Sequence, residues 1–265
     1  MTELPQPENG RFGRVPVRYL LPNMITLLAL CSGVTAIRLG IEGRYELAAG
    51  AVIIAIVLDA VDGRLARFLK GTSRFGAELD SLADFVNFGV APAILIYVWS
   101  LEALKGRGWI AALMLAIACA LRLARFNVAL DDPHKPAWKN AFFSGAPAPA
   151  GAGLAMAPMY LGFLAEVGNG RAYAWFIVPY IISVALLMVS PIPTYSGKNF
   201  GSSISRAMVL PILGLTALGV ILLVTFPWEM LVAAAAAYIA MIPLAVRSYR
   251  RQAKDGARKA ELPGS

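Results

Sequence analysis

Residues 47–67 read LAAGAVIIAIVLDAVDGRLAR, an apolar run that charged side chains interrupt only near its end. A helix needs about 20 mostly apolar residues to cross the hydrocarbon core of a bilayer, and this run is long enough. Its two aspartates would lie where an unpaired charge is costly, which makes them candidates for a functional site. The stretch therefore predicts a membrane-spanning helix that carries polar chemistry near one end.

Seven further segments have a similar length and apolar character. Hydrophobic residues make up 58% of the 265 residues and charged residues 15%, whereas charged residues make up about 25% of an average soluble domain. This composition argues against a water-soluble enzyme, and we expect an all-α, polytopic membrane protein with about eight transmembrane helices. The predicted spans are 20–39, 47–67, 81–101, 109–129, 147–166, 173–192, 207–226 and 228–246.

The Lys and Arg residues predict an orientation, because cytoplasmic loops carry an excess of them. With the N-terminus inside, 19 of the 24 basic residues fall on the cytoplasmic side. We expect a multi-pass protein of the cell (inner) membrane with both termini cytoplasmic: residues 1–19 form a cytoplasmic or interfacial segment, 20–246 the membrane catalytic domain and 247–265 a basic tail. Topology accounts for the net charge of +8, so anionic membrane lipids are expected partners and nucleic acid is not.

Four aspartates concentrate the acidic charge at one predicted site. Asp59 and Asp62 are three residues apart near the end of the second span, and Asp80 and Asp84 are four apart near the start of the third. Residues three or four apart share a helix face, so two pairs of carboxylates can meet across a short loop. Four converging carboxylates need cations, and oxygen ligands favour Mg²⁺, Mn²⁺ or Ca²⁺. Two such ions would resemble a two-metal centre for phosphoryl transfer.

Neighbouring residues suit a phosphate ester. Gly63 and Gly76 leave room for a ligand beside the backbone, Ala66 keeps the helix face open, and Arg67 offers a planar fork of donors. The alternative is a polar helix end whose carboxylates only pair with arginines. The single histidine argues against a histidine-based zinc site or triad, which leaves the chemistry to carboxylates, hydroxyls and basic residues.

Residues 58–84, LDAVDGRLARFLKGTSRFGAELDSLAD, carry a family motif. They resemble the signature of the CDP-alcohol phosphatidyltransferases, DxxDGxxAR, eight residues, then GxxxDxxxD, with every fixed position present. The resemblance implies an all-helical membrane core of six helices and a homodimer. It also implies transfer of a phosphatidyl-type group from a CDP-linked lipid to an alcohol, with release of CMP.

The resemblance also assigns roles to residues. Asp59, Asp62 and Asp80 would hold the divalent metals, two ions of Mg²⁺ or Mn²⁺, with Ca²⁺ as another ion that could bind. Asp84 would ligate metal and act as the general base that deprotonates the acceptor hydroxyl. The residues that would contact the CDP-lipid are Pro22, Asn23, Thr26, Gly63, Arg67, Ser73 and Gly76. For Asn23 and Thr26, a helix cap and a packed hydroxyl are the alternative roles.

Segments outside the motif bear on the acceptor alcohol. The strings ALRLARFNVA (120–129), FFSGAPAPAGAG (142–153) and PNMITLLALCSG (22–33) resemble integral-membrane bacterial phosphatidylserine synthases. This implies CDP-diacylglycerol as donor and L-serine as acceptor. The serine carboxylate would need a cation, for which Arg122, Arg125 and Lys198 are candidates, and Asn127 could add a hydrogen bond. The alternative for the three basic residues is that they only set the orientation in the membrane.

Two groups of competing functions remain. The same chemistry could use glycerol 3-phosphate, an inositol phosphate or choline; phosphorylated acceptors would need more clustered basic residues, and choline an aromatic cage. An ion-coupled transporter is the remote alternative, and it predicts carboxylates near the bilayer midplane together with paired broken helices. The aspartates are instead predicted near the cytoplasmic ends of neighbouring spans.

Overall fold

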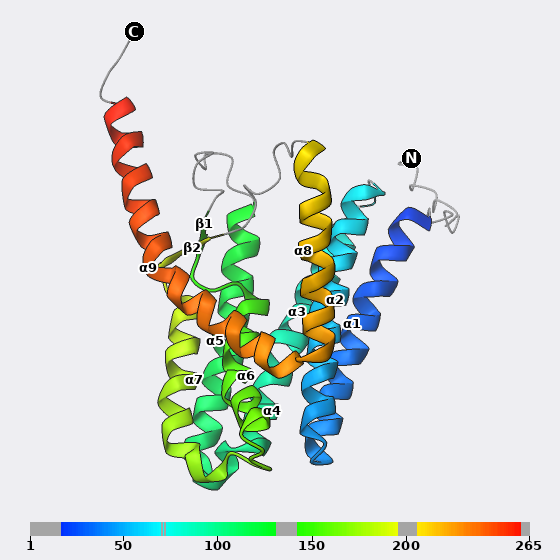
Figure 1. Cartoon of the computed structure of the whole chain (residues 1–265), viewed down its shortest axis with the longest axis vertical. Helices are drawn as coiled ribbons and strands as arrows, with labels where there is room; N and C mark the ends of the chain where they lie inside the picture. Colours follow the sequence, from blue (N-terminus) through cyan, green and yellow to red (C-terminus); the bar gives the residue numbers. More distant parts are fainter. Residues whose placement is uncertain (1–16, 70, 72, 131–141, 196–205, 261–265) are drawn as a thin grey trace, which may run out of the picture.

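The computed structural model describes residues 17–69, 71, 73–130, 142–195 and 206–260, which form a helical bundle with one short strand pair (Figure 1). Residues 1–16 of the predicted N-terminal segment (1–19) and Lys198 lie outside the described residues. In chain order the elements are α1 (Val17–Ile41), α2 (Tyr45–Phe68), α3 (Arg74–Asp84), η1 (Phe85–Val90), α4 (Ala91–Trp99), η2 (Leu101–Leu104), α5 (Gly106–Leu130), β1 (Phe142–Ser144), α6 (Ala148–Leu164), η4 (Arg171–Tyr173), α7 (Ala174–Val189), β2 (Pro193–Tyr195), α8 (Arg206–Thr225) and α9 (Pro227–Ala260).

Each of the eight predicted spans corresponds to a helix or to a continuous helical run. Six of them are long and apolar enough to cross a membrane, as judged by length and composition. The other two are α2, whose charged residues interrupt its apolar sequence, and α6, which has 17 residues. The prediction of an all-α, polytopic membrane protein is confirmed.

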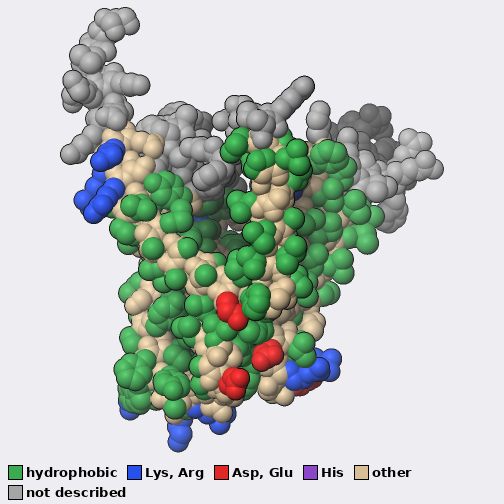
Figure 2. Space-filling view, in the orientation of Figure 1, with side chains coloured by type: hydrophobic (Ala, Val, Ile, Leu, Met, Phe, Trp, Pro, Cys, Tyr) green, Lys and Arg blue, Asp and Glu red, His purple; other side chains and the backbone are tan. Residues whose placement is uncertain are grey.

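The outer surface agrees with a lipid environment. Large hydrophobic side chains are exposed along the helices, above all on α8. Figure 2 shows one face that is mostly hydrophobic, with Lys and Arg gathered at its lower end and near the end of α9. A soluble monomer rarely exposes so large an apolar surface, so lipid is the expected contact.

The third span departs from a regular α-helix. Helix α3 begins seven residues before the predicted start, and it continues through η1, which is a π-helix, into α4. Pro92 lies in the first turn of α4 and has no N–H to donate, which favours a local change in the hydrogen-bond pattern. Single π-turns inside α-helices occur often at functional sites. This one begins directly after Asp84.

Two strands of three residues each were not predicted. β1 pairs antiparallel with β2. This pairing joins the connection before α6 to the connection after α7. Gly145 follows β1 with a φ of +75°, and a side chain there would also meet the backbone oxygen of Met188 at 2.5 Å. Glycine is therefore required at this turn. Pro147 caps α6 and Pro149 lies in its first turn, as a helix start allows.

The end of the bundle that carries the α2–α3 connection is called the aspartate end. It also holds the start of α1, the end of α5 and the strand pair (Figure 1). The three ion pairs between described residues all lie at the opposite end, where Glu42 meets Arg38 and Arg44, and Glu102 meets Arg171. Helix α9 runs obliquely over α6 and passes β2.

Candidate active site

The four predicted aspartates come from two helices that meet at the aspartate end. Asp59 and Asp62 lie in the last turns of α2, and Asp80 and Asp84 lie in the second half of α3. One carboxylate oxygen each from Asp59, Asp62 and Asp80 lies within 4.8 Å of the others. Asp84 lies close enough to Asp59, Asp62 and Asp80 to interact with them electrostatically. The predicted convergence of the two pairs is therefore present.

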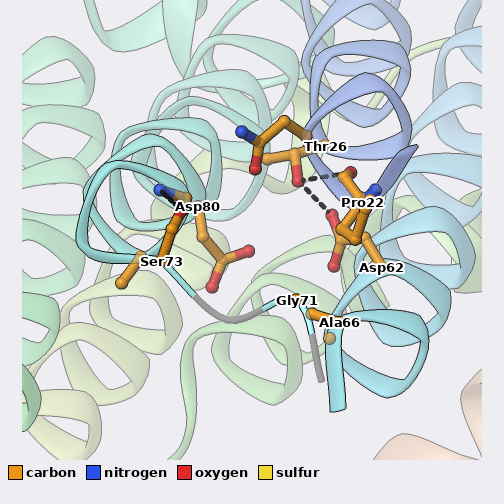
Figure 3. Close-up of a pocket in the computed structure, with 11 residues that line it drawn as sticks. Pro22, Thr26, Asp62, Ala66, Gly71, Ser73 and Asp80 are labelled. Atoms are coloured by element: carbon orange, nitrogen blue, oxygen red, sulfur yellow. Dashed lines mark hydrogen bonds between the residues drawn. The ribbon is translucent and has the colours of Figure 1, made fainter. Parts of the chain in front are cut away.

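Helix α1 supplies a fixed contact to this cluster. The Thr26 hydroxyl lies 2.6 Å from Oδ2 of Asp62 and 3.2 Å from the carbonyl oxygen of Pro22 (Figure 3). Both Thr26 and Asp62 are buried, with 5% and 3% exposure. A buried carboxylate that accepts a hydrogen bond from a hydroxyl group is held in one orientation, so Thr26 aligns Asp62. The family resemblance implies a nucleotide contact for this residue, with a packed hydroxyl as the alternative, and neither includes this alignment of Asp62.

The carboxylates are chemically suited to bind cations. Oδ1 of Asp62 and Oδ1 of Asp84 are buried and have no hydrogen-bond partner in the part of the chain that the structure describes. None of the ion pairs between described residues involves the four aspartates. A buried carboxylate without a partner is costly, and a hard divalent cation with oxygen ligands would remove that cost. The residues present therefore fit Mg²⁺ or Mn²⁺.

A pocket of about 190 Å³ opens beside the cluster between α1, α2 and α3. Asp62 and Asp80 reach it from opposite sides (Figure 3). Six of the seven residues predicted to contact the CDP-lipid line it: Pro22, Asn23, Thr26, Gly63, Ser73 and Gly76. Ala66, Gly71 and Ala77 complete the lining, and the last two were not predicted. All three residues have a short side chain or none, and this is the feature of the sequence that could have indicated a pocket lining.

Arg67 is the one predicted CDP-lipid residue that does not line this pocket. Its Nε donates to the carbonyl oxygen of Gly63 at 2.9 Å, and the side chain is exposed. Ser73, in contrast, lines the pocket and also caps α3, because its hydroxyl accepts from the backbone N–H of Gly76 at 3.0 Å. One serine thus both starts the helix and faces the pocket.

Glycine at position 76 lets α1 and α3 approach closely. A Cβ there would lie 2.8 Å from Oδ1 of Asn23 and 3.1 Å from the Ser73 hydroxyl oxygen. Gly63 differs, because a Cβ at that position would enter open space. Gly76 is therefore needed for packing, while Gly63 leaves room that a ligand could fill.

The residues predicted to bind the acceptor are only partly brought to the cluster. Asn127 contacts the helix that carries Asp80, because its amide donates to the hydroxyl of Ser81, the next residue, at 2.9 Å. Arg122 is 7% exposed and donates to the carbonyl oxygen of Ser144 at 2.7 Å. Arg125 donates to the carbonyl oxygens of Val189 and Ser190. Arg122 thus ties α5 to β1, and Arg125 ties α5 to the end of α7.

Sequence comparisons place this site among known proteins. The model of the CDP-alcohol phosphatidyltransferase family matches residues 19–190, and the model named CDP-alcohol phosphatidyltransferase 2 matches residues 207–243. A CDP-diacylglycerol–serine O-phosphatidyltransferase from Mycobacterium bovis is 38% identical over 235 residues, which cover 87% of this chain and 79% of the relative.

More distant relatives have related names. A CDP-diacylglycerol–serine O-phosphatidyltransferase from Helicobacter pylori is 34% identical over 66% of this chain and 71% of its own length. An archaetidylserine synthase from Methanothermobacter thermautotrophicus is 34% identical over 69% of this chain and 72% of its own length. The first family match covers most of the chain and includes the aspartate cluster and its pocket. The chain belongs to the CDP-alcohol phosphatidyltransferase family.

Proposed function

We propose that this protein transfers the phosphatidyl group of CDP-diacylglycerol to the hydroxyl of L-serine, giving phosphatidylserine and CMP. The observation that carries the proposal is the aspartate cluster of α2 and α3, which adjoins a pocket lined by six of the predicted CDP-lipid residues. The names of the relatives supply the donor and the acceptor. The pocket lies between α1, α2 and α3, and both α1 and the run from α3 to α4 are long and apolar enough to cross a membrane, so the diacylglycerol part of the donor can stay in lipid.

In the proposed reaction, the serine hydroxyl oxygen attacks the phosphorus that carries the diacylglycerol. The bond from that phosphorus to the CMP oxygen breaks, and the Asp84 carboxylate accepts the hydroxyl proton. Asp59, Asp62 and Asp80 would hold divalent ions, with Asp84 as a further ligand. When bound, Mg²⁺ or Mn²⁺ would neutralise the diphosphate and the leaving CMP. This route needs no covalent enzyme intermediate.

The acceptor is proposed to approach from the α5 side. Asn127 is linked to α3 through Ser81, and Arg122 is a buried cation one to two turns earlier on the same helix. A guanidinium has five N–H donors, so Arg122 can bond the Ser144 carbonyl oxygen and still bind a carboxylate. Arg125 and Lys198 remain candidates for the same role, and a homodimer remains an expectation.

We further infer that the aspartate end faces the cytoplasm. The distribution of Lys and Arg supports this orientation, with 19 of 24 on that side under the predicted topology. It puts the pocket on the side where a soluble amino acid and CMP are exchanged. The division into an N-terminal segment (1–19), a membrane catalytic domain (20–246) and a basic tail (247–265) belongs to the same proposal.

An alcohol panel tests the reaction. Purified protein in detergent is expected to release CMP from CDP-diacylglycerol with L-serine and Mn²⁺ or Mg²⁺, and the lipid product should be phosphatidylserine. The same assay runs with glycerol 3-phosphate, inositol phosphate and choline. Release of CMP with one of these and not with serine would overturn the acceptor assignment, and no release with any alcohol would overturn the enzymatic function.

Gly63 offers a test of where the nucleotide binds. We expect Gly63→Ala to raise the KM for CDP-diacylglycerol about tenfold or more, because the new methyl group enters the pocket and displaces a ligand contact. Gly50→Ala is the matched control, since it lies on α2, also has open space and does not line the pocket. Both changes should support helix formation. Equal KM values for the two variants would contradict the assigned pocket.

A further inference from the structure

The turn of helix that follows Asp84 is held unusually tightly. Asn87, in η1, is 1% exposed, and its Oδ1 has no hydrogen-bond partner among the described residues. That oxygen occupies the space where a Cβ on Gly33 of α1 would be; the added carbon would also lie 3.0 Å from Cγ and 3.3 Å from Cα of Asn87. The backbone of α1 therefore packs directly on the Asn87 side chain.

Helix α5 holds the same turn from another side. A Cβ on Gly89 would lie 2.9 Å from Cβ of Cys119, so η1 also packs directly on α5. Neither neighbour leaves space for η1 to move toward it. The position of the chain directly after Asp84 is therefore fixed by two close contacts, and each contact requires glycine.

The face of α1 that makes the first contact consists of small residues. The buried positions are Pro22, Thr26, Ala29, Gly33, Ala36 and Gly40, which repeat every three or four residues. This spacing keeps one helix face against its neighbours over several turns. The same face aligns Asp62 through Thr26 and contacts Asn87 through Gly33.

The π-turn keeps this packing in register. A Cβ on Gly33 would meet Asn87, and one on Gly40 would meet Leu95. The two positions are seven residues apart on α1, whereas their partners are eight residues apart on η1 and α4. A wider π-turn accommodates one extra residue. Without it, the chain before and after η1 could not both present the same face to α1, and Asp84 would be rotated away from the cluster.

We propose that Gly33 and Asn87 are positioning residues, whose contact holds η1 against α1 and thereby fixes the distance between the Asp84 carboxyl group and the pair Asp59 and Asp62. This inference rests on the proposed function for the role of Asp84. Neither residue lines the pocket. Their effect reaches the reaction only through the placement of the general base relative to the metal ligands.

Gly33→Ala is the first test. We expect kcat to fall about 10- to 100-fold, because small misplacements of reacting groups have effects of this size, with the KM for CDP-diacylglycerol unchanged. Gly40→Ala is the control: it crowds the same face of α1 but meets Leu95 of α4, farther from Asp84. It should lower thermal stability about as much as Gly33→Ala and leave kcat unchanged.

A second substitution that restores kcat would distinguish a positioning role of this contact from a general loss of stability. Gly33→Ala combined with Asn87→Ala removes the side-chain atoms that the new carbon would meet, and kcat should recover most of its value. If Gly33→Ala does not fold, Asn87→Gln tests the same contact from the η1 side and should show the same loss of kcat. Unchanged kcat in folded Gly33→Ala or Asn87→Gln, or no recovery in the double variant, would overturn the inference.

Mn²⁺ binding to the same purified samples, followed by electron paramagnetic resonance, separates this inference from the proposed function. Gly33→Ala should bind Mn²⁺ more weakly than wild type and Gly40→Ala equally well, because only the first displaces Asp84. If the wild type releases no CMP yet binding follows this pattern, the proposed function fails and the positioning role stands. If the wild type is active and both variants match it in kcat and Mn²⁺ binding, only the positioning role fails.

Discussion

Asp84→Asn is expected to lower kcat for CMP release by about 10²- to 10⁴-fold, the range that a general base contributes. An amide has nearly the same shape as a carboxylate but cannot accept the proton of the acceptor hydroxyl. Asp84 does not line the nucleotide pocket, so CDP-diacylglycerol should still bind with an affinity near that of wild type. The measurement is CMP release at saturating donor, together with donor binding to the same sample.

Glu78→Gln is the matched control for this variant. Glu78 lies on the same helix, is exposed, and neither lines the pocket nor belongs to the cluster. The chemical change is the same, from a carboxylate to an amide, so activity should stay at the wild-type level. Full activity of Asp84→Asn would show that another group takes the proton, and an equal loss in both variants would point to a general effect of charge on α3.

The sequence was sufficient to predict the helices and the aspartate cluster for a physical reason. Apolar runs of about 20 residues have few alternatives to a membrane helix, since lipid offers no hydrogen-bond partner for exposed backbone. The spacing of Asp59 and Asp62 and of Asp80 and Asp84 places each pair on one helix face. A connection of five residues between α2 and α3 then brings the two faces together.

Contacts between segments distant in the chain were not predictable in this way. No local pattern indicates that Thr26 aligns Asp62, or that Gly33 and Asn87 pack together, because each pair is separated by more than 30 residues. The strand pair depends on residues from two connections of irregular sequence. Arg122 shows the same limit: it is a candidate from sequence for binding the serine carboxylate, whereas its bond to the carbonyl oxygen of Ser144 joins residues 22 positions apart that no local pattern pairs.

Removing divalent cations is expected to abolish activity completely. The carboxylates of Asp59, Asp62 and Asp80 lie together, and Asp84 lies close enough to interact with them electrostatically. None of the four has a basic partner among the described residues, so they repel one another and the diphosphate of the donor unless cations are bound. A chelator should stop CMP release, and added Mn²⁺ or Mg²⁺ should restore it. Asp62→Asn should remain inactive at the metal concentration that saturates the wild type, because an amide brings no negative charge. Unchanged CMP release in excess chelator would contradict the metal-dependent mechanism.

Thr26→Val separates ligand charge from ligand alignment at the same carboxylate. Valine keeps the shape of threonine but removes the O–H that lies 2.6 Å from Oδ2 of Asp62. Loss of a group that orients a metal ligand typically weakens metal affinity or activity by about 10- to 100-fold, so half-maximal activity should need more Mn²⁺ by that factor, with activity recovered at high Mn²⁺. Thr35→Val is the control, because Thr35 lies exposed on the same helix and bonds only the Cys31 carbonyl oxygen. A wild-type Mn²⁺ requirement in Thr26→Val would mean that Asp62 is held in place by its burial and not by the hydroxyl.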